Sequence, residues 1–116
     1  MAPYQTFDRG ALLDRFGGDE DFVRGLLEVV LRSVGSWPAE LRSSGARADF
    51  AGLAALAHKV KGTAGDLVAA ELQVRARDAE LAARAADPGA IALNLELADA
   101  LEDMLAEIRT VVAGAC

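Results

Sequence analysis

The sequence predicts an all-α protein, an antiparallel up-down-up-down four-helix bundle with a short extra N-terminal helix. Hydrophobic residues make up 53% of the chain, aromatic residues only 5%, and there are three prolines, which is a composition typical of helical proteins. Apolar residues recur three and four positions apart, and no segment alternates with the period of two of a strand. The connections between these periodic segments are short, which favours antiparallel neighbours.

The first two helices are expected in the N-terminal third of the chain. A short helix is expected over residues 8–16, "DRGALLDRF", ended by two glycines. Asp19 is expected to cap the second helix, because aspartate side chains accept hydrogen bonds from free backbone N–H groups. Apolar residues then recur at helical spacing from Phe22 to Leu41. Pro38 is expected to kink or divide this long helix.

Three further segments complete the predicted bundle. The stretch "RSSGARAD" is expected to form a turn, with Asp49 as the N-cap of a third helix that extends to about Leu67. The fourth helix is expected from about residue 69 to residue 85. Pro88 is expected at the first position of the last helix, after a cap at Asp87. That helix carries one apolar stripe: Ile91, Leu95, Ala98, Leu101, Leu105, Ile108 and Val112.

Length and charge limit the class of protein. A chain of 116 residues is expected to form one domain, residues 1–116. Its net charge of −6 argues against a nucleic-acid or anionic-membrane surface. The single cysteine, Cys116, allows no internal disulfide and no cysteine-based zinc site. No secretory signal or spanning segment is apparent, so a cytoplasmic location is expected. No phosphate-binding glycine loop occurs, and we expect neither a cofactor, a metal nor ATP to bind.

His58 is the only histidine of the chain and lies in the third predicted helix, in "LAALAHKVKGTAGDL". At about 100° per residue, the side of that helix opposite to it carries the core residues Leu53, Leu56, Val60, Thr63 and Leu67. We therefore expect the imidazole to point into solvent and not into the core.

The side of the helix around His58 holds only small residues: Ala51, Ala54, Ala55, Gly62 and Gly65. This is unusual, because each glycine inside a helix costs about 1 kcal/mol relative to alanine. A partner that must approach the imidazole closely would explain it, so Ala54, Ala55, Gly62 and Gly65, together with Lys59, are assigned to partner docking. The alternative for Gly65 is that the helix already ends there. Lys61, three residues after His58, is on the same side and can reach an anion on the ring.

These residues resemble the histidine-containing phosphotransfer (HPt) domain of two-component phosphorelays. The family signature is a histidine, two further residues and then Lys-Gly in the second helix of a four-helix bundle, and it reads here "HKVKG", residues 58–62. The likeness extends to the flanking stretches "FDRGALLDRFGGDEDFVRGLLEVVL" and "ADFAGLAALAHKVKGTAG". One departure is Val68, where the family typically has glycine, which predicts a longer or differently bent turn.

The resemblance implies a phosphoryl carrier that is not itself a kinase. His58 would accept a phosphoryl group through Nε2 from an aspartyl phosphate of a receiver domain and pass it to another receiver. Lys61 would stabilise the phosphoryl charge. The implied partners are receiver domains of response regulators or of hybrid histidine kinases, and the protein is expected to be a monomer.

Two other functions remain as alternatives. The first is a helical interaction module that binds a partner without phosphoryl transfer, although binding alone does not explain an imidazole centred among small residues. The second is an enzyme that uses His58 as a general base. Such an enzyme needs a cleft and a second catalytic group, which the neighbours of His58 on its own helix do not provide.

Overall fold

The computed structural model describes residues 7–114, and the regular secondary structure in that range consists entirely of helices. The predicted all-α fold is therefore confirmed. Six helices follow one another along the chain: α1 Arg9–Arg15, α2 Glu20–Val34, α3 Trp37–Ala46, α4 Phe50–Asp66, α5 Ala70–Arg84 and α6 Ala90–Ala113.

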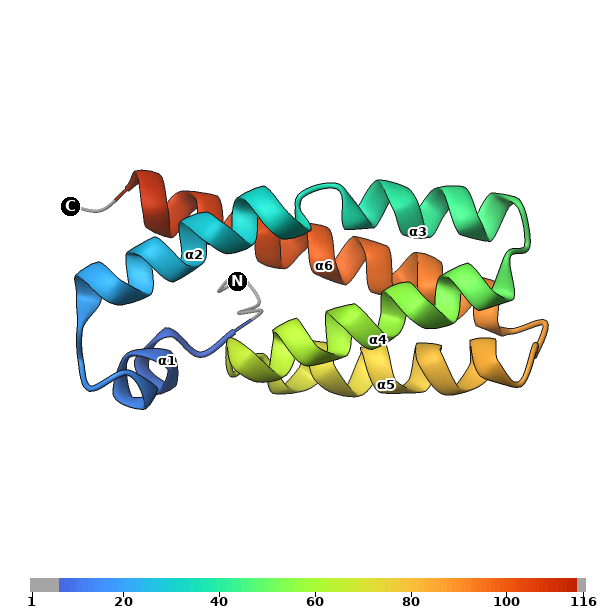
Figure 1. Ribbon diagram of the computed structural model, residues 1–116, viewed down its shortest axis with the longest axis horizontal. Coiled ribbons are helices and arrows are strands. Elements are labelled where there is room, and N and C mark those ends of the chain that lie inside the picture. Colours follow the sequence, from blue (N-terminus) through green and yellow to red (C-terminus); the bar gives the residue numbers. More distant parts are fainter. Residues whose placement is uncertain (1–6, 115–116) are drawn as a thin grey trace, which may run out of the picture.

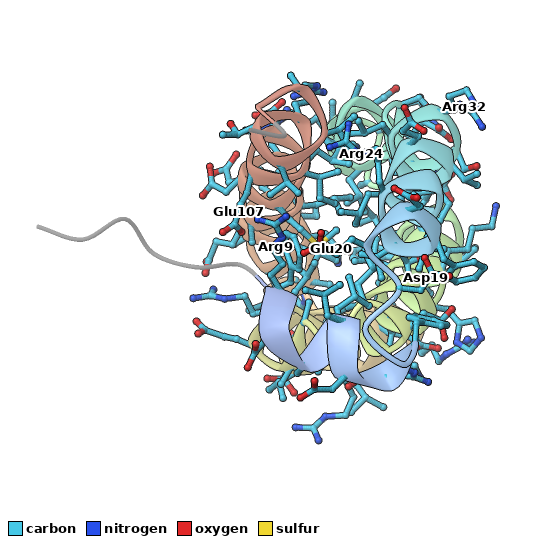
Figure 2. All side chains as sticks on the ribbon, turned by 90° about the vertical axis from the view of Figure 1, so that its left-hand side faces the viewer. Arg9, Asp19, Glu20, Arg24, Arg32 and Glu107 are labelled. Atoms are coloured by element: carbon cyan, nitrogen blue, oxygen red, sulfur yellow. The ribbon has the colours of Figure 1, made fainter. Side chains whose placement is uncertain are left out.

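Helices α2 to α6 lie along the long axis of an elongated molecule, 44 × 30 × 21 Å, and α1 lies across one end (Figures 1 and 2). In Figure 1, α2 and α3 run one after the other along one side, and α4 and α5 form a hairpin along the other side. The long helix α6 packs against α2, α3, α4 and α5. The core accordingly forms where the buried faces of these helices meet α6, as in its fully buried residues Leu97, Leu101, Met104 and Ile108.

Aspartate caps begin three of the helices, as their side-chain chemistry predicts. The Asp19 side chain accepts a hydrogen bond of 3.0 Å from the Phe22 N–H, and the Asp49 side chain accepts one of 2.9 Å from the Gly52 N–H. Asp8 caps α1 in the same way. The two caps predicted at Asp19 and Asp49 are therefore confirmed.

The long second helix is divided, as Pro38 predicts. The break lies at residues 35–36, and Pro38 is the second residue of α3. Proline is tolerated there because a backbone N–H in the first turn would have no acceptor within the helix. A Cβ atom at Gly35 would lie 2.7 Å from the Leu31 carbonyl oxygen, so the break depends on glycine. Since α3 continues to Ala46, the first five residues of the predicted turn "RSSGARAD" are helical, and the turn covers only residues 47–49.

The predicted start of the last helix was also wrong. The Asp87 side chain accepts a hydrogen bond of 2.8 Å from the Gly89 N–H, and its carbonyl accepts one of 2.9 Å from the Ala90 N–H. These bonds close a turn around Pro88, and α6 begins only at Ala90. Pro88 therefore precedes the helix, because the Asp87 side chain stabilises a turn instead of capping the first helical turn.

The end of the bundle that holds α1 carries several charged side chains (Figure 2). Arg9, Glu20 and Arg24 line a small cavity of about 90 Å³ there, between α1, α2 and the last turns of α6. Arg24 also donates a hydrogen bond of 3.3 Å to the Val112 carbonyl. This contact connects α2 to the C-terminal part of α6.

Candidate functional site

His58 lies near the middle of α4, and 61% of its side chain is exposed. The core side of α4 is formed by other residues, among them the fully buried Leu53 and Val60. The predicted exposure of the imidazole is therefore confirmed, and it follows from the periodicity of α4 alone.

A carboxylate from the neighbouring helix contacts the imidazole, and the sequence reasoning missed it. His58 Nδ1 lies 3.1 Å from Glu80 Oε2, and only 7% of the Glu80 side chain is exposed. Glu80 lies in α5, 22 residues after His58. One signal was available, because at about 100° per residue Glu80 borders the apolar stripe of α5, where a charged side chain is unusual.

Two cations complete the cluster around Glu80. Lys61 Nζ lies 2.8 Å from Oε1, and the Arg84 guanidinium donates to Oε2 from Nε at 2.9 Å and from Nη2 at 2.6 Å. The hydrogen bond from Lys61 lowers the pKa of Glu80 to about 2, with help from Arg84 and His58 and against the effect of burial. Glu80 is therefore a carboxylate anion at neutral pH.

The charge of Glu80 determines which imidazole nitrogen carries the proton. An ionised carboxylate only accepts hydrogen bonds, so in neutral His58 the proton is on Nδ1 and the lone pair is on Nε2. Within residues 7–114, the hydrogen bond of the ring runs through Nδ1. The arrangement can therefore present Nε2 of an exposed ring as a nucleophile.

The small residues predicted to surround His58 have different environments. Gly62 is exposed, and a Cβ atom there would meet nothing within 4 Å. Ala55 and Lys59 are also exposed. Gly65 is half-buried: a Cβ atom there would lie 2.7 Å from Gln73 Nε2, and the Gly65 carbonyl accepts a hydrogen bond of 3.0 Å from Arg15. Since α4 continues to Asp66, Gly65 belongs to its last turn.

Ala54 was expected on the exposed side, and this placement is wrong. Only 5% of Ala54 is exposed, because α5 packs against that side of α4. It lines an open groove of about 470 Å³ between the two helices, together with Phe50, Ala51, Ala55, Ala83, Arg84 and Ala86. The groove begins one helical turn from His58, and Arg84 belongs both to it and to the Glu80 cluster. A docking partner could therefore contact Ala54 only where it lines this groove.

A second titratable group beside His58 was not expected. The sequence reasoning considered only the neighbours of His58 on its own helix, and Glu80 reaches the ring from α5. Within residues 7–114, no three metal-ligating side chains of His, Cys, Asp or Glu gather as a metal site would require. In the same range, no helix has the length and apolar character that crossing a membrane requires.

Comparison with protein families gave a match over most of the chain. The family model described as Hpt domain matches residues 25–111. This range includes His58, Lys61, Glu80 and Arg84. Searches of curated proteins and of solved structures gave no match.

Proposed function

Since the chain belongs to the Hpt domain family, a family of histidine phosphotransfer in two-component phosphorelays, we propose that His58 is its phosphoryl acceptor. His58 accepts the group from the phosphorylated aspartate of one receiver domain and donates it to the aspartate of another. One observation carries the assignment: an exposed imidazole, the only one in the chain, is held through Nδ1 by a buried carboxylate.

The transfer step uses the free nitrogen of the ring. The Nε2 lone pair attacks the phosphorus of the aspartyl phosphate, and the bond from phosphorus to the aspartate oxygen breaks. That oxygen leaves with the electron pair, which regenerates the carboxylate of the receiver. The proton on Nδ1 remains in the hydrogen bond to Glu80. The reverse sequence passes the phosphoryl group to the next receiver.

Lys61 and the open surface near the ring are assigned supporting roles. Lys61, 33% exposed, can turn toward a phosphoryl group on Nε2 and stabilise its charge. Ala55, Lys59 and Gly62 form the surface on which a receiver docks, because a close approach needs small or flexible side chains there. Ala54 and Gly65 contribute at the edges of this surface, since Ala54 is buried and Gly65 is half-buried.

The fold and the partners follow from the same assignment. With α2 and α3 taken as one divided helix, the chain forms an up-down-up-down four-helix bundle, a single domain over residues 1–116. Its partners are receiver domains of response regulators or of hybrid histidine kinases, which it meets as a cytoplasmic monomer. The receiver and its phosphorylated aspartate supply the reactive phosphoryl group, so the chain needs no ATP, metal or cofactor of its own. It has no part in binding nucleic acid or membrane.

The two alternative functions, a module that only binds a partner and an enzyme with His58 as general base, explain the contacts of His58 and Glu80 less completely. A module that only binds a partner has no use for a buried carboxylate that fixes the tautomer of an exposed histidine. A general base needs an enclosed substrate site, whereas the groove beside His58 is open.

The proposal is tested by incubating the protein with a panel of receiver domains phosphorylated on their aspartates. We expect label on the parent that is lost in acid and retained in alkali, as for phosphohistidine. His58→Gln should keep the helical circular dichroism and melting temperature of the parent, because the ring is exposed and makes one hydrogen bond. It should take up no label. Undiminished acid-labile labelling of His58→Gln would contradict the assignment.

A further inference from the structure

The Glu80 cluster holds more charge than the positioning of a ring requires. Glu80 is the only anion among four side chains in contact, with His58 on one oxygen, Lys61 on the other and Arg84 beside His58. A neutral amide could accept the same hydrogen bond from Nδ1. The carboxylate does two further things: it binds both cations, and it places a negative charge one imidazole ring away from Nε2.

We propose that Glu80 sets the phosphoryl-transfer equilibrium of His58, so that the phosphoryl group is held weakly enough to be passed on. This inference rests on the proposed function and deepens it, because it concerns how strongly the product is stabilised. The acceptor role of His58 does not depend on it.

The argument follows the charges through the transfer step. With neutral His58, the four side chains carry a formal charge of +1. Because Nδ1 keeps its proton, the transfer places close to two negative charges on the phosphoryl group and one positive charge on the ring, a net charge of about −1. Glu80 attracts the ring and repels the phosphoryl group, and it competes with the phosphoryl group for Lys61 and Arg84, the two cations that contact it. Because Glu80 opposes the net negative charge that the transfer adds and holds the two cations that could pair with it, we expect the phosphorylated state to be less stable than with a neutral residue at this position.

The hydrogen bond to Nδ1 affects how readily the phosphoryl group leaves the ring. A carboxylate keeps the proton on Nδ1 after Nε2 has bound phosphorus, and a protonated ring is the better leaving group in the next transfer. An amide can turn its NH₂ group toward Nδ1 and stabilise the deprotonated ring instead. Glu80 thus favours departure of the phosphoryl group through both its charge and its hydrogen bond.

A set of three variants tests the proposal by changing the charge of the cluster. Glu80→Gln removes one negative charge at constant shape, and it should shift the partition between receiver and His58 about tenfold toward phosphohistidine. Lys61→Gln should shift it in the opposite direction. The double variant restores the formal charge of the parent, so its partition should return close to the parent value. It also keeps the test valid if Glu80→Gln alone folds poorly.

The partition is measured by mixing phosphorylated receiver domain with each variant and following the label to equilibrium. The matched control is Glu71→Gln, which removes the same charge from the same helix at an exposed position paired with Arg75 and should leave the partition unchanged. If Glu80→Gln slows transfer equally in both directions and leaves the partition unchanged, Glu80 only positions the ring and the proposal is overturned.

A second measurement separates this proposal from the proposed function. Phosphoramidate is used to phosphorylate the isolated protein, and the lifetime of the phosphohistidine is followed without any receiver. Glu80→Gln should lengthen that lifetime, and an unchanged lifetime would count against the role of Glu80. A parent that phosphoramidate labels but that exchanges with no receiver would contradict the proposed function, and the lifetimes would still decide the role of Glu80.

Discussion

Three helices end with a residue other than glycine in the left-handed conformation. Ala48, Val68 and Ala86 have φ angles of 51°, 57° and 51°. Each lies one residue beyond a C-cap, and the two hydrogen bonds of a Schellman motif close each turn; after α4, for example, the Ala69 N–H donates to the Ala64 carbonyl at 2.8 Å. A side chain in this conformation costs roughly 1–2 kcal/mol, so these turns carry strain that glycine would avoid.

Because Val68 stands where the family typically has glycine, we predicted a longer or differently bent turn between α4 and α5. The turn is short, residues 67–69, because Val68 adopts the left-handed conformation itself. Its carbonyl also accepts a hydrogen bond of 3.4 Å from the Asp8 N–H, which connects this turn to the start of α1.

Ala48→Gly should raise the free energy of unfolding by about 1 kcal/mol, because Ala48 is exposed and loses only a strained methyl group. Urea unfolding followed by circular dichroism measures the change. The matched control is Ala106→Gly, an equally exposed alanine within α6, which should lower the stability by a similar amount. If both variants lose stability, the left-handed turn is not strained.

At the scale of a single element, α4 combines three features of the proposed site on one surface. It carries the exposed His58, it positions Lys61 one turn later, and it leaves open space at Gly62. Gly62 costs the helix about 1 kcal/mol relative to alanine. Since a Cβ atom there meets nothing within 4 Å, packing against a neighbouring helix does not explain the glycine. The proposed docking of a receiver at this surface would explain it.

Gly62→Leu should therefore make the protein at least as stable as the parent and much slower in transfer from a receiver. Gly62→Ala should be stabilised by close to 1 kcal/mol and only mildly impaired. Melting temperatures and initial labelling rates test both expectations. A leucine variant that melts several degrees lower and still accepts phosphate normally would remove the docking role from Gly62 and from the adjoining Ala55 and Lys59.

At the scale of the whole molecule, charged contacts tie together helices that are distant in the sequence. Arg42 of α3 contacts Asp99 at 2.7 Å and Glu102 at 3.0 Å, both in α6. These carboxylates raise the pKa of Arg42 and keep it charged. All three side chains are well exposed, so the pairs contribute little to stability. Glu80, which joins α5 to α4, is only 7% exposed, so the loss of its contacts should affect stability more.

The stability that Glu80 provides should depend on pH. Its pKa is lowered from an ordinary value of 4.5 to about 2, so the folded protein favours the anion. The contribution is fully present above about pH 4.5 and is lost as the pH falls toward 2. The parent should thus be more stable than Glu80→Gln at pH 7, and the difference should shrink between pH 4.5 and 2. Urea unfolding at several pH values measures it.

The Glu71→Gln variant provides the comparison for this pH dependence. Glu71 pairs with Arg75 within α5 at an exposed position, so its removal should change stability little at any pH. A difference between the parent and Glu80→Gln that stays constant down to pH 2 would contradict the low pKa of Glu80.

The sequence by itself determined the features that depend on one helix at a time. Helical periodicity is local, so it correctly placed His58 outside and Leu53 and Val60 inside. Cap chemistry is also local, and it located the starts of α2 and α4 at Asp19 and Asp49. Boundaries were less certain where two local preferences compete, as at Asp87, which can cap a helix or close a turn.

Only the tertiary structure decided which residues of different helices meet. Periodicity gives the direction in which a side chain points from its own helix. It does not tell which neighbouring helix packs against that side, or which residues of the neighbour lie level with the side chain. The packing of α5 against α4 buries Ala54 and brings Glu80 and Arg84 into one cluster with His58 and Lys61. The exposed histidine that we propose as the nucleophile could thus be found from the sequence. The carboxylate that fixes its tautomer could not, because a register between helices depends on the packing of all their side chains.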